Sequence, residues 1–346
     1  MDTTANNIMT VEPVQANSLA RVNTLDGNSV KDARINKAVI SKNNIVKNSN
    51  GKNSMTANRK VRHAPIGLFD SGVGGLSVYL HLAQQLPAEH YIYYADTLNV
   101  PYGNRDSEDI ETLTLNAVEW LYQQGCKLIV IACNSASAYA LDRARRCYPE
   151  LPIVGLVPAL KPAVLASKSG HVAVLATKAT LNGTLLNDVI SNVADPNGTL
   201  VTKYFDPQLV PWVESGMPVQ DETAQRLRQR IQAFADDGVD QLVLGCTHYP
   251  FFKAFLLDEI ARQQLSIQVV DSGQAIAERV KQLLVANQMS ASLDSETKDY
   301  HSEVSSKTKV DISYPLTFHA TKYSDRLGAL VVRLLGRETV LQYHTE

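Results

Sequence analysis

The chain has 346 residues, 45% of them hydrophobic, which is enough for more than one domain with a sizeable core. A net charge of −2 argues against a general nucleic-acid binder, and four cysteines without a CxxC pair argue against a disulfide scaffold or a structural zinc site. No apolar run is typical of a signal peptide or a membrane span. We therefore expect a protein of the reducing cytoplasm, with no membrane or specific nucleic-acid partner.

Residues 1–62 differ in composition from the rest of the chain. They are rich in Asn, Ser, Thr and Lys, lack aromatic residues, and carry ten Lys or Arg against four Asp or Glu. Such a segment buries too little apolar surface to offset the entropy of ordering it. We predict a disordered N-terminal extension.

From residue 66 onward, short apolar runs alternate with amphipathic stretches. Among the helical stretches, 107–124 has Ser107 as a plausible N-cap, and 220–237 is a second clear example. This alternation predicts an α/β fold with parallel sheets flanked by helices. The predicted strands are 66–69, 91–95, 127–132, 152–156, 171–176, 200–204, 240–245, 266–270 and 315–319.

The two halves of this pattern look alike. Each has an early strand that ends in small hydroxyl residues, near Ser71 and Thr177, and a later strand that ends in a cysteine, Cys133 or Cys246. Two similar lobes that face each other would bring the two cysteines together. Ligands of open parallel sheets bind beyond the carboxyl ends of the strands, where these residues lie.

The first motif runs from Asp70 to Gly75 (Asp-Ser-Gly-Val-Gly-Gly). Its glycines permit a tight turn and a close backbone approach, so a small carboxylate could bind its amides while Asp70 accepts from an ammonium group. A nucleotide-phosphate loop with Asp96 as the ribose-binding acid is an alternative. The G-x-G-G spacing and the missing Lys-Ser/Thr disfavour it. A purely structural turn is a further alternative.

A second motif follows the next predicted strand, with Asn99 leading into Pro101, Tyr102 and Gly103. Pro-Tyr-Gly is a turn signal in its own right, and a structural turn is the simplest interpretation. The functional alternative is a loop whose amides and Tyr102 cover a small substrate.

The two cysteine motifs place thiols beside polar side chains. Cys133 is followed by Asn134 and Ser135, which supply donors and can start a helix whose N-terminus lowers a thiol pKa. Cys246 is followed by Thr247 and His248, and the histidine could move a proton or stabilise a thiolate. A paired set of thiols can remove a proton from one face of a carbon and return one to the other. The other two cysteines lack such neighbours, and we interpret Cys126 and Cys147 as structural.

Taken together, these motifs resemble those of glutamate racemases, in the aspartate/glutamate racemase family. The resemblance covers roughly residues 64–337. It rests on residues 69–75, 94–96, 101–103, 132–134, 245–250, 271–273 and 318–321, in this order. A Glu at position 248 would be usual in an aspartate racemase, so His248 favours glutamate.

The resemblance implies a cofactor-independent isomerase, without metal, that interconverts L- and D-glutamate and supplies D-glutamate for peptidoglycan. It also implies two pseudo-twofold related Rossmann-like lobes with the active site between them: residues 63–156 and 270–346 form the first, with a surface insertion at 287–313, and 157–269 the second. By resemblance the acid/base set is Cys133, Cys246, Asp70, His248 and Glu214. The substrate contacts are Asp70, Ser71, Pro101, Tyr102, Gly103, Asn134, Ser135, Thr247 and His248.

Three departures and three alternatives accompany this interpretation. Ser135 replaces the usual Thr but keeps its hydroxyl, the N-terminal extension is longer than the family norm, and the insertion at 287–313 is unusual. Some family members with shorter extensions are activated by UDP-N-acetylmuramoyl-L-alanine, but activation of this chain does not follow from the resemblance; a homodimer is compatible with it. The alternatives are an aspartate or related racemase, a non-catalytic regulator that binds a nucleotide or precursor, and an interaction protein with a basic tail.

Overall fold

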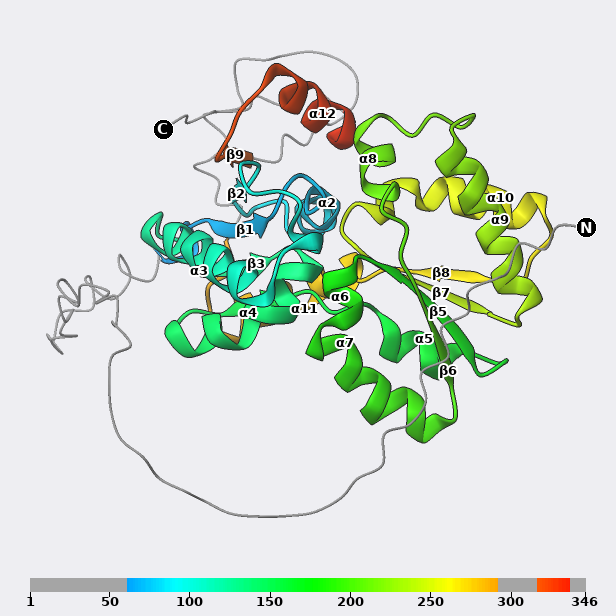
Figure 1. Cartoon of the computed structure of the whole chain (residues 1–346). Helices are drawn as coiled ribbons and strands as arrows, with labels where there is room; N and C mark the ends of the chain where they lie inside the picture. Colours follow the sequence, from blue (N-terminus) through cyan, green and yellow to red (C-terminus); the bar gives the residue numbers. More distant parts are fainter. Residues whose placement is uncertain (1–60, 292–315, 337–346) are drawn as a thin grey trace, which may run out of the picture. The chain divides into compact units, whose positions relative to one another are not determined.

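The computed structural model describes residues 61–291 and 316–336, and all of them fall in one compact unit that spans residues 50–346. It contains two parallel sheets flanked by helices, as predicted (Figure 1). The first sheet has the strand order β4-β3-β1-β2-β9 and the second has the order β6-β5-β7-β8. Its first sheet comprises β1 (Ile66–Asp70), β2 (Tyr91–Ala95), β3 (Leu128–Ile131), β4 (Ile153–Gly155) and β9 (Leu316–Ala320); the second comprises β5 (His171–Ala176), β6 (Leu200–Tyr204), β7 (Gln241–Gly245) and β8 (Gln268–Val270).

The two sheets repeat one strand order. β5 corresponds to β1, β7 to β3, β6 to β2 and β8 to β4, and β9 is an additional edge strand on the first sheet. The chain therefore returns to the first sheet after completing the second. The exact lobe boundaries stay a prediction, and residues 1–60 and 292–313 of the predicted extension and insertion lie outside the described residues.

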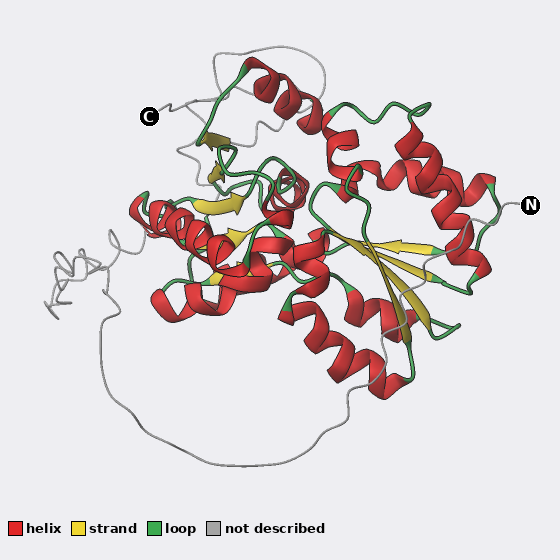
Figure 2. Cartoon of the chain, in the orientation of Figure 1, coloured by secondary structure: helices red, strands yellow, loops and turns green. Residues whose placement is uncertain are grey.

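Helices cover both faces of each sheet (Figure 2). The longer ones are α2 (Leu76–Gln85), α3 (Ser107–Gln123), α4 (Asn134–Cys147), α9 (Glu222–Asp236), α10 (Lys253–Arg262), α11 (Gly273–Ala286) and α12 (Asp325–Leu335); the shorter ones are α5 (Leu160–Ala166), α6 (Lys178–Asn182), α7 (Thr184–Val189) and α8 (Leu209–Glu214). The predicted N-cap of α3 was wrong. Asp106 precedes the helix in extended conformation, and Ser107 is its first residue.

Alternation along the strands decides which helices each residue meets. In β3, Leu128 and Val130 pack in the same core as residues of α2 and α11, whereas Ile129 and Ile131 pack with α3 and α4. Cys133 lies on the same side of its strand as Ile129 and Ile131 and packs with them. Cys246 likewise lies on the same side as Leu242 and Leu244 of β7, which pack with residues of α9 and α10. Each thiol thus emerges at a strand end with its direction fixed by buried neighbours.

No helix within the described ranges combines the length and the apolar character that a bilayer crossing needs.

Candidate active site

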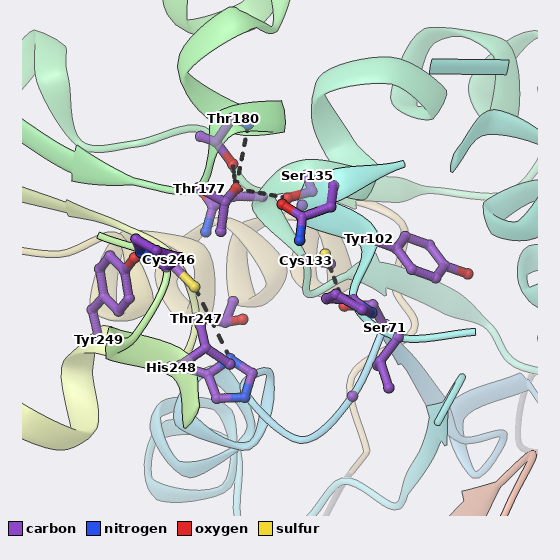
Figure 3. Close-up of a pocket in the computed structure, with 18 of the residues that line it drawn as sticks. Ser71, Tyr102, Cys133, Ser135, Thr177, Thr180, Cys246, Thr247, His248 and Tyr249 are labelled. Carbon is purple, nitrogen blue, oxygen red and sulfur yellow. Dashed lines mark hydrogen bonds between the residues drawn. The ribbon is translucent and has the colours of Figure 1, made fainter. Parts of the chain in front are cut away.

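Residues at the carboxyl ends of strands from both sheets line a cavity of about 370 Å³. It is lined by both predicted thiols: Cys133 follows β3 and Cys246 follows β7. Figure 3 shows the two side chains on facing sides of the pocket, with Ser71 beside one and His248 beside the other. The two cysteines therefore come from equivalent strands of the repeated order and meet at one cavity.

Most of the predicted site lies here. The cavity is lined by all of the predicted catalytic and substrate-contacting residues except Asp70: Ser71, Pro101, Tyr102, Gly103, Cys133, Asn134, Ser135, Glu214, Cys246, Thr247 and His248. Asp70 sits behind this wall with 1% of its surface exposed. Its carboxylate accepts from the backbone N–H of Gly72 at 2.9 Å and from the Thr247 hydroxyl at 3.4 Å.

The groups that contact the Cys133 thiol belong to the first lobe. Cys133 is the N-cap of α4, and its sulfur accepts from the N–H of Ala136 at 3.5 Å and lies 3.6 Å from the Ser71 hydroxyl oxygen. Burial and then the charge of Asp70 raise its pKa to about 12, against the smaller effect of hydrogen bonds from the Ala136 backbone and from the side chain and backbone of Ser71. The sequence-based expectation of a lowered pKa was therefore wrong for this thiol, because a helix N-terminus does not offset desolvation.

Cys246 has a different neighbour. Its sulfur lies 4.0 Å from Nδ1 of His248, whose Nε2 lies 3.1 Å from Oε1 of Glu214. Burial acts to lower the pKa of His248, but hydrogen bonds to Cys246 and Glu214 and the charges of both outweigh it and raise that pKa to about 10. A positively charged imidazole thus stands beside this thiol.

The glycine loop serves packing between the lobes. A Cβ atom on Gly74 would lie 2.4 Å from Nδ1 of His248 and 2.5 Å from the Thr247 hydroxyl oxygen. The close approach that its sequence predicted is therefore made to the second lobe at this position. Ser77, three residues further on, donates to the backbone oxygen of Thr247 at 2.8 Å and holds the same contact.

The side chain of Tyr102 is held by the carboxylate of Asp96, which also binds two other side chains. Asp96 accepts from the Tyr102 hydroxyl at 2.6 Å, from the Asn99 amide at 3.0 and 3.1 Å, and from the Thr321 hydroxyl at 2.9 Å. Burial and the Asp96 contact raise the pKa of Tyr102 far above its ordinary value, so its ring stays neutral. Asp96 is 4% exposed and fully engaged, which leaves no role for it as the ribose-binding acid of a nucleotide site.

Sequence reasoning missed two hydroxyl residues of the second lobe. Thr177 and Thr180 line the cavity, and a chain of hydroxyls runs from Ser135 to Thr177 at 2.9 Å and on to Thr180 at 3.0 Å (Figure 3). Thr177 directly follows β5, as Ser71 follows the equivalent β1. The internal duplication seen in the sequence was the signal that could have pointed to it.

Among the described residues, no Lys or Arg side chain lines the cavity. Its polar lining among the described residues consists of hydroxyls, amides, thiols, His248 and the carboxylates of Asp206 and Glu214. An anionic ligand group would therefore be bound by hydroxyl and amide donors, the imidazolium of His248 and the α4 N-terminus. Also within the described part of the chain, no cluster of three His, Cys, Asp or Glu side chains is placed to hold a metal ion.

The chain matches the model of the Asp/Glu/Hydantoin racemase family over residues 66–280, and it therefore belongs to this family of isomerases. Its relatives are glutamate racemases. The enzyme of Deinococcus radiodurans is 50% identical over 220 residues, which cover 64% of this chain and 74% of that protein.

Solved glutamate racemases share the fold. The enzyme of Francisella tularensis in complex with D-glutamate superposes with a TM-score of 0.66 at 25% identity, over 82% of this chain and 98% of that one. The Escherichia coli enzyme in complex with L-glutamate and the activator UDP-MurNAc-Ala gives a TM-score of 0.63 at 28% identity, with the same coverage.

Proposed function

We propose that this protein interconverts L- and D-glutamate by two-base proton transfer between Cys133, Cys246 and the substrate α-carbon. The observation that carries the proposal is the pair of thiols from equivalent strands at one cavity. One thiolate removes the α-proton, and the opposite thiol donates a proton to the other face. The roles of the two residues exchange with the hand of the substrate.

The supporting groups have distinct tasks in this proposal. His248, held by Glu214, stabilises the Cys246 thiolate, and Asp70 acts from behind Cys133. Ser135, Thr177 and Thr180 bind one substrate carboxylate through their hydroxyls, while Ser71, Asn134 and Thr247 supply donors to the rest of the molecule. Pro101, Tyr102 and Gly103 form the wall that covers it. Donors preorganised around the α-carboxylate stabilise the developing carbanion.

The wider role of the protein is a further part of this proposal. We propose that the D-glutamate supplies peptidoglycan synthesis in the cytoplasm, and that neither metal nor organic cofactor takes part. UDP-MurNAc-Ala, the activator bound to the Escherichia coli enzyme, is the candidate effector, and a homodimer is the candidate assembly.

The decisive experiment is chiral analysis of L-glutamate and, separately, D-glutamate incubated with purified protein under reducing conditions and without added cofactor. We expect both to approach an equal mixture, with deuterium from D₂O entering the α-position. L-Aspartate in parallel distinguishes the aspartate alternative, since turnover of aspartate in preference to glutamate would contradict the assignment. Absence of both racemisation and exchange would favour a non-catalytic binding protein.

A further inference from the structure

The C-terminal helix α12 contacts the second lobe although its preceding strand, β9, belongs to the first sheet (Figure 1). Nη2 of Arg333 donates to the backbone oxygen of Glu214 at 2.5 Å. Glu214 is the last residue of α8, so the guanidinium satisfies a carbonyl that has no partner within the helix. Positive charge is also favoured at this helix end.

The turn after α8 is shaped to admit this side chain. Gly216 has φ of 101°, and a Cβ atom there would lie 3.0 Å from Nη1 of Arg333. A glycine therefore meets two needs at this position, the left-handed backbone and the space beside the guanidinium. The turn at Gly216 thus leaves room for the Arg333 guanidinium that binds the end of α8.

The side chain of Glu214 reaches His248, the neighbour of the Cys246 thiol. Its Oε1 lies 3.1 Å from His248, but 40% of its side chain is exposed, so packing does not hold this carboxylate in place. Its position depends on the backbone that carries it, and Arg333 fixes that backbone from the other lobe. Asp70 is a further ionisable neighbour of His248, and Tyr249 is one of the Cys246 thiol.

We propose that Arg333 is a positioning residue for the Cys246 half of the site: it holds the end of α8 so that Glu214 stays bonded to His248. This inference rests on the proposed function and adds a residue that lies outside the cavity. Cys133 is independent of the contact, because its partners Ser71 and Ala136 belong to the first lobe.

The test compares Arg333→Met and Arg333→Lys with Arg326→Met, a control on the same helix whose side chain is also exposed. All are full-length chains. We expect Arg333→Met to lower kcat about three- to ten-fold with little change in KM, since Arg333 does not touch the cavity. Arg333→Lys should recover most of this loss, and Arg326→Met should match the wild type.

Two further readouts separate positioning from a general loss of structure. By NMR titration, the midpoint of the His248 ring should fall from about 10 in the wild type to a lower value in Arg333→Met. Peptide-resolved alkylation at pH 8 should slow at Cys246 and stay unchanged at Cys133. Arg333→Gln serves in place of the Met variant if that protein does not fold.

An unchanged His248 midpoint, or equal changes at both cysteines, would overturn the inference. The proposed function is judged separately, by racemisation in the wild type. If wild type and variant both fail to racemise while the His248 midpoint still falls in the variant, the positioning contact stands and the proposed function does not.

Discussion

The two halves of the site hold their thiols at the same place in the strand order but in opposite electrostatic surroundings. Cys133 and Cys246 are almost equally buried, at 5% and 7% exposure. Cys133 faces the negative Asp70, whereas Cys246 faces His248, which the interactions with Cys246 itself and with Glu214 keep protonated. The neighbours rather than the burial therefore distinguish the two residues.

This difference suits two-base chemistry, which needs one thiol and one thiolate at the start of each turnover. Because its pKa is about 12, Cys133 is protonated at neutral pH and is the proton donor at the start of the turnover. Cys246 has the imidazolium of His248 beside it in place of a carboxylate. We infer that the resting enzyme is prepared to remove a proton on the Cys246 side, and the predictions below test this asymmetry.

The largest effect is expected from removing either thiol. Cys133→Ser and Cys246→Ser should each lower racemisation by about 10³- to 10⁴-fold, because a serine hydroxyl is a much poorer acid/base group. Each variant keeps one thiol, so in D₂O it should exchange the α-proton of only one hand of glutamate. Cys147→Ser, at an exposed position outside the cavity, is the matched control. Exchange of both hands by a single-thiol variant would contradict the two-sided arrangement.

Reactivity towards iodoacetamide should separate the cysteines next. At pH 8 the Cys133 thiolate is scarce because its pKa is about 12, so we expect Cys246 to react on the order of 10² faster in the substrate-free protein. Raising the pH towards 11 should accelerate Cys133, since the thiolate fraction of a thiol with a raised pKa grows up to that pKa. Peptide mass spectrometry reads both sites in one sample. Equal rates at pH 8 would refute the asymmetry.

Removing the charge of Asp70 should change the alkylation rate of Cys133 and the rate of racemisation in opposite directions. Asp70→Asn keeps an oxygen that can accept from Gly72 but removes the charge that raises the Cys133 pKa. Alkylation of Cys133 at pH 8 should then rise by up to about ten-fold as its thiolate fraction grows, while racemisation falls by about ten-fold because the carboxylate proposed to support proton transfer at Cys133 is gone. Asp188→Asn, at an exposed site, should change neither. Changes of the same sign in both assays would show that Asp70 acts on something other than this thiol.

The strands and both cysteine motifs could be predicted from sequence because their signals are local. Uninterrupted apolar runs such as Leu128–Ile131 fit strands covered on both faces, and the polar residues after each cysteine are its neighbours in the chain. The hydroxyls of Thr177 and Thr180 could not be found this way. Thr177 joins Ser135 only when the two sheets meet, at a separation of 42 residues, and Thr180 joins through Thr177.

Electrostatic detail was also beyond the sequence. The position of Cys133 at a helix start predicts a lowered pKa, but its burial and the buried carboxylate behind it reverse the sign. Likewise, the Asp70–Gly75 motif predicts a ligand loop, and Ser71 and Gly72 do line the cavity, but Asp70 lies behind its wall and Gly74 packs against His248. Such outcomes depend on which groups the fold brings together and on how far water is excluded.

The smallest effect is expected where the two lobes share the hydroxyl chain. Ser135→Ala removes the 2.9 Å contact with Thr177, and we expect KM to rise about three- to ten-fold with kcat nearly unchanged, because the lost donor binds substrate and transition state alike. Ser135→Thr keeps the hydroxyl and should stay within about two-fold of the wild type. Steady-state kinetics with both hands of glutamate measure these effects. A fall in kcat without a change in KM would mean that Ser135 acts on the neighbouring thiol instead of on a substrate carboxylate.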